Sequence, residues 1–136
     1  MPKTYTLCKD ERLYLREAIS DLFARGKGFM VFPYRVQYNV LPEDDPQVAR
    51  VAIMAIAPKK KFKHAVDRNR EKRLIREAYR LNKLPLIQAF ERAGKKLQVA
   101  FIYSDTQHTT FQKAEQNIKK AISLIIRKAL KNGEEQ

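Results

Sequence analysis

The chain has 136 residues, enough for one domain with a proper core, and 44% of them are hydrophobic, which excludes a disordered basic tail. It carries 28 Lys and Arg against 15 Asp and Glu, a formal net charge of +13. A folded domain this basic repels itself, and binding to a polyanion is the usual reason for tolerating that repulsion. Nucleic acid is therefore the leading class of partner, and the plain alternative is a merely basic soluble protein.

The cysteine content and the hydropathy exclude two further classes. Cys8 is the only cysteine, so neither an intramolecular disulfide nor a cysteine-rich zinc site can form. The first residues lack the apolar run of a signal peptide, and no segment approaches the roughly 20 apolar residues of a membrane span. We therefore expect a cytoplasmic protein with no membrane partner.

In the first third of the chain the hydrophobic period changes from that of a helix to that of a strand. Residues 10–25 predict a helix, because apolar residues such as Leu15 and Leu22 recur at helical spacing and Gly26 follows as a stop. Over residues 29–41 the side chains alternate between the two faces of a strand.

An acidic turn at 41–46 predicts that the next apolar run, 51–57, returns as an antiparallel neighbour of that strand. Because every position of 51–57 is apolar, we expect a central strand covered on both sides. The later segments predict a helix over 67–82, a short helix between Pro85 and Gly94, a strand over 97–103 and a final helix over 110–131. Residues 1–131 then form a single α+β domain, with 132–136 as a frayed tail.

The strongest functional signal is a cationic segment between Lys59 and Arg80. Its ten basic residues face three acidic ones: Lys59, Lys60, Lys61, Lys63, Arg68, Arg70, Lys72, Arg73, Arg76 and Arg80 against Asp67, Glu71 and Glu77. At about 100° per residue, one arc of the predicted helix carries Arg68, Asn69, Lys72, Arg73, Arg76 and Arg80. The opposite arc carries the apolar residues Leu74, Ile75, Ala78 and Leu81, and can dock on a core.

These side chains suit RNA in kind as well as in charge. Each arginine is a planar fork that can bind two phosphate oxygens, and Asn69 can reach a ribose hydroxyl or a base edge. We expect Asp67 to cap the N-terminus of the helix. The alternative is a solvated helix face with pairs between neighbouring side chains, but three acids cannot neutralise ten bases.

The helix carries a recognisable pattern: Arg68-Asn69-Arg70, then Lys72-Arg73, then Arg76-Glu77-Ala78. This pattern resembles the signature of the protein component of bacterial ribonuclease P. The resemblance extends to Arg12-Leu13, to the segment from Phe23 to Gly26, to the strand that reaches Tyr38 and to Lys60-Lys61. It implies a single-domain αβββαβα sandwich, a fold shared with a ribosomal protein domain, with the basic helix in a left-handed βαβ crossover. Since it implies three strands before the helix, residues 29–41 either form two strands or hide a short one near 29–32.

The resemblance also implies a division of labour. A catalytic RNA subunit removes the 5′ leader of precursor tRNA, using Mg²⁺ held mainly by that RNA and the substrate, so we expect no catalytic or metal-binding side chain in the protein. Contacts to the RNA subunit are implied for Arg68, Asn69, Arg70, Lys72, Arg73, Arg76 and Arg80. Contacts to the leader are implied for Phe23, Tyr38, Lys60 and Lys61, with the RNA subunit as the alternative ligand of the two lysines. The two rings either stack on leader bases in a cleft between the first helix and the sheet or pack in the core. No obligate protein partner is implied.

The chain departs from the family pattern at two places. Ile19 stands where the family often has a second Phe, which removes one stacking platform. Lys63 and His64 stand where the family commonly has Gly and Asn, so the loop geometry differs while the added cation favours RNA.

Three other functions compete with this one. A purely structural ribosome-associated RNA binder shares the charge but has no reason to contain the Arg-Asn-Arg helix. A DNA-binding regulator needs a helix and a turn before its recognition helix, where this chain has a strand and Pro58. A membrane-surface helix needs a stronger apolar face than this one, which lacks Trp and Phe.

Overall fold

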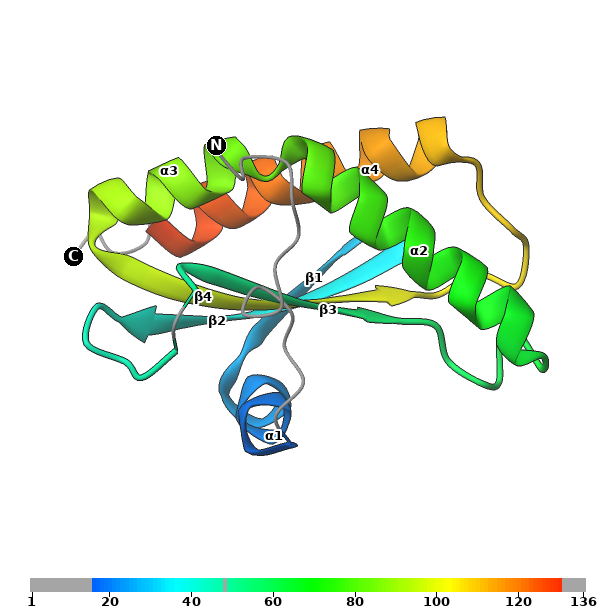
Figure 1. The fold of residues 1–136 in the computed structure, drawn as a ribbon, viewed down its shortest axis with the longest axis horizontal. Helices are drawn as coiled ribbons and strands as arrows, with labels where there is room; N and C mark the ends of the chain where they lie inside the picture. Colours follow the sequence, from blue (N-terminus) through cyan, green and yellow to red (C-terminus); the bar gives the residue numbers. More distant parts are fainter. Residues whose placement is uncertain (1–15, 48, 131–136) are drawn as a thin grey trace, which may run out of the picture.

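The computed structural model describes residues 16–47 and 49–130, and its helices and strands follow the predicted order (Figure 1). The elements are α1 (Arg16–Arg25), β1 (Lys27–Val31), β2 (Tyr34–Pro42), β3 (Val51–Ile56), α2 (Ala65–Asn82), α3 (Leu84–Ala93), β4 (Lys95–Tyr103) and α4 (Phe111–Ile125). The α+β prediction is confirmed, and residues 29–41 belong to two strands because the chain turns at Phe32 and Pro33. The predicted residues 10–15 of the first helix and the predicted tail, 132–136, lie outside the described residues.

The four strands form one mixed sheet in the order β1-β2-β4-β3. The last strand in the chain, β4, lies inside the sheet, antiparallel to β2 and parallel to β3. The prediction that β3 is a central strand and an antiparallel neighbour of β2 is therefore wrong, because β4 separates the two and leaves β3 at an edge. A parallel pair needs a crossover connection, and α2 together with α3 provides it.

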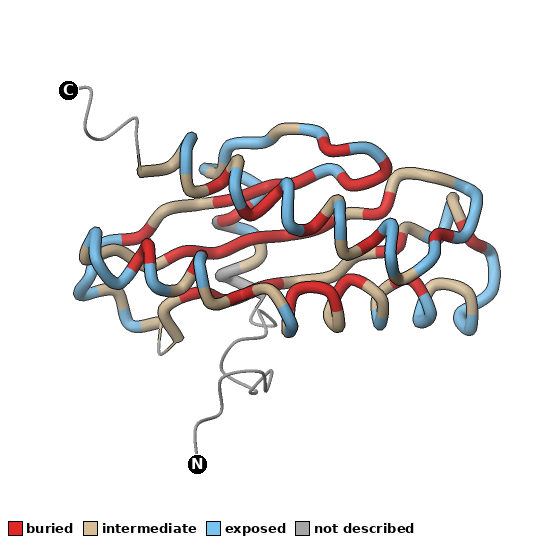
Figure 2. The backbone as a smooth tube through the Cα atoms, turned by 90° about the horizontal axis from the view of Figure 1, so that it is seen from above, coloured by how far each residue is buried: buried red, intermediate tan, exposed pale blue. Residues whose placement is uncertain are grey.

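Helices cover both faces of the sheet and give the molecule three layers. In Figure 1, α2, α3 and α4 lie on one face and α1 lies on the other. Figure 2 shows buried residues along the strands and on the inward sides of the helices. Both layers bury β3, since Val51 and Ile53 face the main core while Ala52 packs with Leu22 of α1. Its sequence is apolar at every position for this reason, although it is an edge strand.

The strand register decides which layer each side chain of β2 meets. Tyr34, Val36 and Tyr38 face the layer of three helices and are buried in the main core. Arg35 and Gln37 alternate with them and face the α1 side. The two-residue period predicted for this strand is confirmed.

The ends of the later helices agree with their capping residues. Pro85 lies in the first turn of α3, and Gly94 ends this helix with a φ of 67°, a left-handed conformation that glycine adopts without strain. The hydroxyl of Thr110 accepts a hydrogen bond from the backbone N–H of Lys113 and caps α4. This helix continues as a π-helical segment, Ile126–Leu130. Among the helices that the structure describes, none is long and apolar enough to cross a membrane.

Candidate nucleic-acid interface

The predicted basic helix is α2, and its buried side overlaps the predicted one, with Ile75 and Ala78 buried as predicted, but is shifted around the helix. The fully buried residues are Glu71, Ile75, Ala78 and Tyr79. Leu81, predicted to dock on the core, is 38% exposed. The helix is therefore rotated about its axis relative to the prediction, because Tyr79 packs against Phe101, with their ring centroids 6.3 Å apart, and takes the inward position.

The outer side of α2 carries polar and cationic side chains that contact solvent. Asn69 and Arg73 are exposed, and Lys72 and Arg76 are partly exposed. Within residues 16–47 and 49–130, no hydrogen bond or ion pair engages the side chains of Asn69, Lys72 and Arg73. In that part of the chain none of the five N–H donors of Arg73 has a partner, which makes this residue the clearest candidate for a phosphate contact.

Other arginines of the predicted row are bound within the protein. Arg68 donates from Nη1 to the backbone oxygens of Phe62 and Lys63, each at 2.9 Å, and so ties the preceding loop to α2. Arg80 donates from Nε and Nη2 to the carboxylate of Glu77, each at 3.0 Å, and this contact lowers the pKa of Glu77. The row is therefore uneven, with some cations available for a ligand and others used to hold the structure.

The loop that Arg68 ties down carries the predicted leader-contacting lysines. Lys60 is exposed and Lys61 is partly exposed, and the backbone N–H of Lys61 donates to the oxygen of Pro58 at 3.0 Å. The structure thus places both lysines in the loop that leads into the N-terminus of α2, and their contact with the leader stays a prediction.

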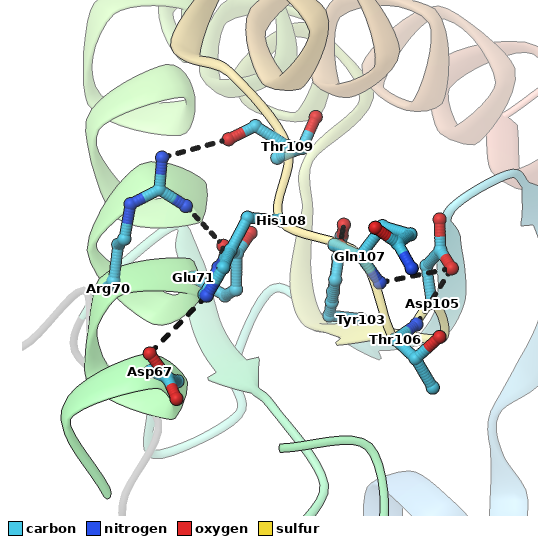
Figure 3. Close-up of polar contacts among 9 residues, drawn as sticks. All are labelled: Asp67, Arg70, Glu71, Tyr103, Asp105, Thr106, Gln107, His108 and Thr109. Carbon is cyan, nitrogen blue, oxygen red and sulfur yellow. Dashed lines mark hydrogen bonds and ion pairs between the residues drawn. The ribbon is translucent and has the colours of Figure 1, made fainter. Parts of the chain in front are cut away.

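The N-terminal half of α2 carries a buried carboxylate, that of Glu71 (Figure 3). Glu71 Oε2 is 2.6 Å from Arg70 Nη1 and 2.5 Å from His108 Nδ1. Arg70 Nη2 also donates to the backbone oxygen of Thr109, in the loop before α4, at 3.2 Å. A buried carboxylate is stable only when it is paired, and Arg70 and His108 supply the pairing. No local signal in the sequence marks Glu71 as buried or identifies its role, since its partner His108 is 37 residues away.

The prediction that Asp67 caps α2 is wrong. The helix begins at Ala65, and His64 occupies the N-cap without a side-chain hydrogen bond. Asp67 lies within the first turn instead, where a carboxylate still interacts favourably with the positive end of the helix dipole. Its Oδ1 is 3.3 Å from His108 Nε2, so it joins the cluster around Glu71.

The two aromatic rings predicted to line a leader cleft lie on opposite faces of the sheet. Phe23, on α1, is 44% exposed. Tyr38 faces the layer of three helices, is 4% exposed and has its ring centroid 6.0 Å from that of Phe29. The two rings therefore do not share a cleft. Tyr38 packs in the core, which is the alternative that the sequence left open for this ring.

The α1 side of the sheet carries a hollow that the sequence did not predict. It measures about 480 Å³ and is lined by Gly28, Phe29, Met30, Arg35 and Gln37. Met30 is 52% exposed, so an apolar side chain and a guanidinium lie on the same open surface. No local pattern marks these residues as a site, because the hollow depends on the pairing of β1 with β2, which brings residues from two strands together.

Comparison with known proteins relates this chain to one family. The family model described as Ribonuclease P matches residues 7–128. The chain is 40% identical to a ribonuclease P protein component from Porphyromonas gingivalis over 124 residues, which cover 91% of this chain and 89% of that one. It is 38% identical to a protein of the same description from Chlorobaculum tepidum over 109 residues, covering 74% and 69% of the two chains.

Solved structures share the fold. The RNase P protein of Staphylococcus aureus superposes with a TM-score of 0.65 at 15% identity, covering 84% of this chain and 94% of that one. The RNase P protein from Thermotoga maritima superposes with a TM-score of 0.65 at 21% identity, covering 85% and 97%. The predicted α+β sandwich of helices packed on one sheet is confirmed by these likenesses.

Proposed function

This chain belongs to the ribonuclease P protein family, and on that premise we propose that α2 is the helix through which it binds the RNA subunit of ribonuclease P. A member of the family is the protein component of a ribonucleoprotein endonuclease that acts with an RNA subunit in 5′ processing of tRNA. The observation that carries the proposal is the outer side of α2, where Asn69, Lys72 and Arg73 face solvent without partners in the described part of the chain. Guanidinium and ammonium groups placed on a rigid helix suit the phosphates of a folded RNA.

The partnered arginines support this role by holding the surface in place. Arg68 fixes the loop that carries Lys60 and Lys61, and Arg70 joins α2 to the loop before α4. Arg70 engages one N–H on each terminal nitrogen, so three of its five donors remain for RNA, and its side chain is 47% exposed. These arginines can therefore stabilise the fold and bind RNA at the same time. Because their side chains are already ordered in the free protein, less conformational entropy is lost on binding.

The 5′ leader of precursor tRNA is the second proposed ligand, and the α1 side of the sheet is its proposed site. Phe23 exposes a ring there, and the hollow between β1 and β2 adds Met30 and Arg35. Apolar surface beside a cation is the combination that single-stranded RNA needs, because bases stack while the backbone is neutralised. Of the two rings predicted to contact the leader, only that of Phe23 belongs to this proposed site, because Tyr38 faces the opposite side of the sheet.

Magnesium is the proposed cofactor of the assembled enzyme, held by RNA and substrate. It would supply the charge stabilisation for hydrolysis, since this hard cation prefers phosphate oxygens. The acidic residues of α2 do not fit such an ion. Asp67 contacts His108, Glu71 contacts Arg70 and His108, and Glu77 contacts Arg80, so each carboxylate already faces a basic side chain. We therefore assign the ion no ligand from this helix.

Reconstitution tests the proposed function directly. The protein is added to a bacterial ribonuclease P RNA at a magnesium concentration too low for the RNA alone, and cleavage of precursor tRNA is measured. We expect cleavage at the mature 5′ end to be restored. The cationic side chains of the bound protein neutralise phosphates of the RNA and so replace part of the magnesium that the RNA requires. Binding without restored cleavage would leave a structural RNA-binding protein as the better assignment.

Phe23→Ala is expected to weaken binding of precursor tRNA about 5- to 100-fold while leaving mature tRNA unaffected, because only the precursor has a leader base to stack on the ring. The measurement is the pair of dissociation constants for precursor and mature tRNA, each with the reconstituted enzyme. Phe23→Tyr is the matched control and should behave as the parent, since it keeps the ring. An equal loss for both tRNAs would remove Phe23 from the leader site.

A further inference from the structure

Three stacked rings run from the core to the surface beside α2. Tyr103 of β4 stacks on Phe62 with ring centroids 5.7 Å apart and an interplanar angle of 18°. Phe62 stacks in turn on His108, at 4.8 Å and 19°. Tyr103 and Phe62 are buried, whereas the side chain of His108 is 39% exposed. The stack therefore ends in solvent with an imidazole ring.

The orientation of this outermost ring is held by its neighbours. Its two nitrogens face carboxylates, with Nδ1 at 2.5 Å from Glu71 Oε2 and Nε2 at 3.3 Å from Asp67 Oδ1 (Figure 3). One ring face is covered by Phe62. The side chain of His108 is 39% exposed, so the ring surface that Phe62 and the carboxylates leave uncovered is where a flat ligand can reach it.

The loop that carries His108 is fixed at several points, so the flat surface is preorganised. Burial, together with the charges of Glu71 and Asp105, raises the pKa of Tyr103 to about 12. Its hydroxyl thus stays protonated and donates to the backbone oxygen of Gln107. The side chain of Asp105 accepts from the backbone N–H groups of Thr106 and Gln107 and closes a tight turn. A ring held in this way loses little freedom when a ligand covers it.

The end of the stack lies beside the residues that the proposed function assigns to RNA. Arg68 donates to the backbone oxygen of Phe62, the middle ring. Arg70 shares the carboxylate of Glu71 with His108 and keeps donors for a phosphate. A base lying on His108 would therefore have guanidinium groups close to its own backbone.

We propose that His108 is a stacking platform for an unpaired base of the RNA subunit, with Arg70 binding a phosphate next to that base. The proposal rests on the proposed function of α2. Protein side chains recognise RNA mainly through unstacked bases placed on aromatic or histidine rings, so a histidine presented beside two arginines suits such a base. The RNA subunit is favoured over the leader, because the stack belongs to the α2 side of the sheet and the proposed leader site lies on the α1 side.

Two substitutions separate stacking from pairing. His108→Ala and His108→Phe both lose the contacts to Glu71 and Asp67, and only the second keeps a ring. We expect His108→Ala to weaken binding to the RNA subunit about 5- to 100-fold, and His108→Phe to stay within about threefold of the parent. Equal weakening by both substitutions would mean that His108 acts through the carboxylates, and no weakening by His108→Ala would mean that nothing stacks there. Either result overturns the proposal.

Fluorescence gives a readout that does not depend on affinity or on the stability of the other variants. The chain has no tryptophan, so His108→Trp introduces a single reporter. Its emission should be quenched when the RNA subunit binds, because a stacked base lies against the indole. Gln88→Trp, at an exposed position of α3, is the control and should change little. An unquenched reporter in a bound complex overturns the proposal, and quenching by a free leader oligonucleotide but not by the RNA subunit overturns the choice of ligand.

The outcomes also distinguish this proposal from the proposed function. If Arg73→Ala weakens RNA-subunit binding while His108→Ala does not, α2 binds RNA and the platform is wrong. If neither substitution has an effect, the proposed role of α2 fails as well.

Discussion

Arg73→Ala is expected to lower the affinity for the RNA subunit about 10- to 150-fold, since a hydrogen bond to a charged group contributes roughly 1.5–3 kcal/mol. Arg73 is the residue of choice because it is exposed and its side chain makes no hydrogen bond or ion pair within the described residues that its loss would disturb. The plot of log affinity against log salt should also flatten by about 0.7–0.9, the value for one phosphate contact. Filter binding at several salt concentrations measures both quantities.

Arg92→Ala is the matched control for this experiment. Arg92 is an exposed arginine on α3, away from the outer side of α2, and its substitution removes the same unit of charge. We expect a change of less than about threefold, because the long-range field of one charge is largely screened at moderate salt. Equal losses for the two substitutions would show that net charge alone attracts the RNA, and α2 would then have no special role.

Tyr38→Ala is expected to lower the free energy of unfolding by about 3–5 kcal/mol, the usual cost of removing a buried aromatic ring. Tyr38 is 4% exposed and belongs to the main core between the sheet and the three helices. Its removal leaves a cavity beside Phe29, because the neighbouring β2–β4 pairing prevents full collapse. Chemical denaturation followed by circular dichroism measures the change.

Two companion variants test whether Tyr38 belongs to the core or to the leader site. Tyr38→Phe keeps the ring and should retain the stability of the parent to within about 1 kcal/mol. Phe23→Ala should also change stability by about 1 kcal/mol or less, since this ring is 44% exposed. If Tyr38→Ala folds with the stability of the parent but binds precursor tRNA poorly, the ring contacts the leader and its placement in the core is wrong.

The position of α2 follows from the topology of the sheet. The crossover from β3 to β4 lays this helix along one face, and Ile75 and Tyr79 anchor it on the core. The outer side then projects from a rigid base, so a phosphate contact made by Arg73 costs little ordering of the backbone. A flexible basic tail of equal charge would lose more entropy on binding the same RNA.

Local patterns in the sequence determined the elements and the identity of the functional helix. Helical spacing, the alternation in β2, and the stop at Gly94 each depend on near neighbours in the chain, so they can be read without the fold. The cationic arc is local too, because a helix repeats every 3.6 residues and so places Lys72, Arg73 and Arg76 on one side. These features are present in the structure close to their predicted positions.

Only the tertiary structure decided which residues meet across the chain. The place of β4 beside β3, the opposite faces of Phe23 and Tyr38, and the burial of Glu71 all depend on contacts between distant segments. The pairing of Glu71 with His108 spans 37 residues. From the sequence alone, an acidic residue on a basic helix is expected to be solvated. Neither composition nor periodicity shows that a residue of a distant segment pairs with it and buries it. The sequence therefore determined the kind of surface, and the fold decided which of its side chains are available for RNA.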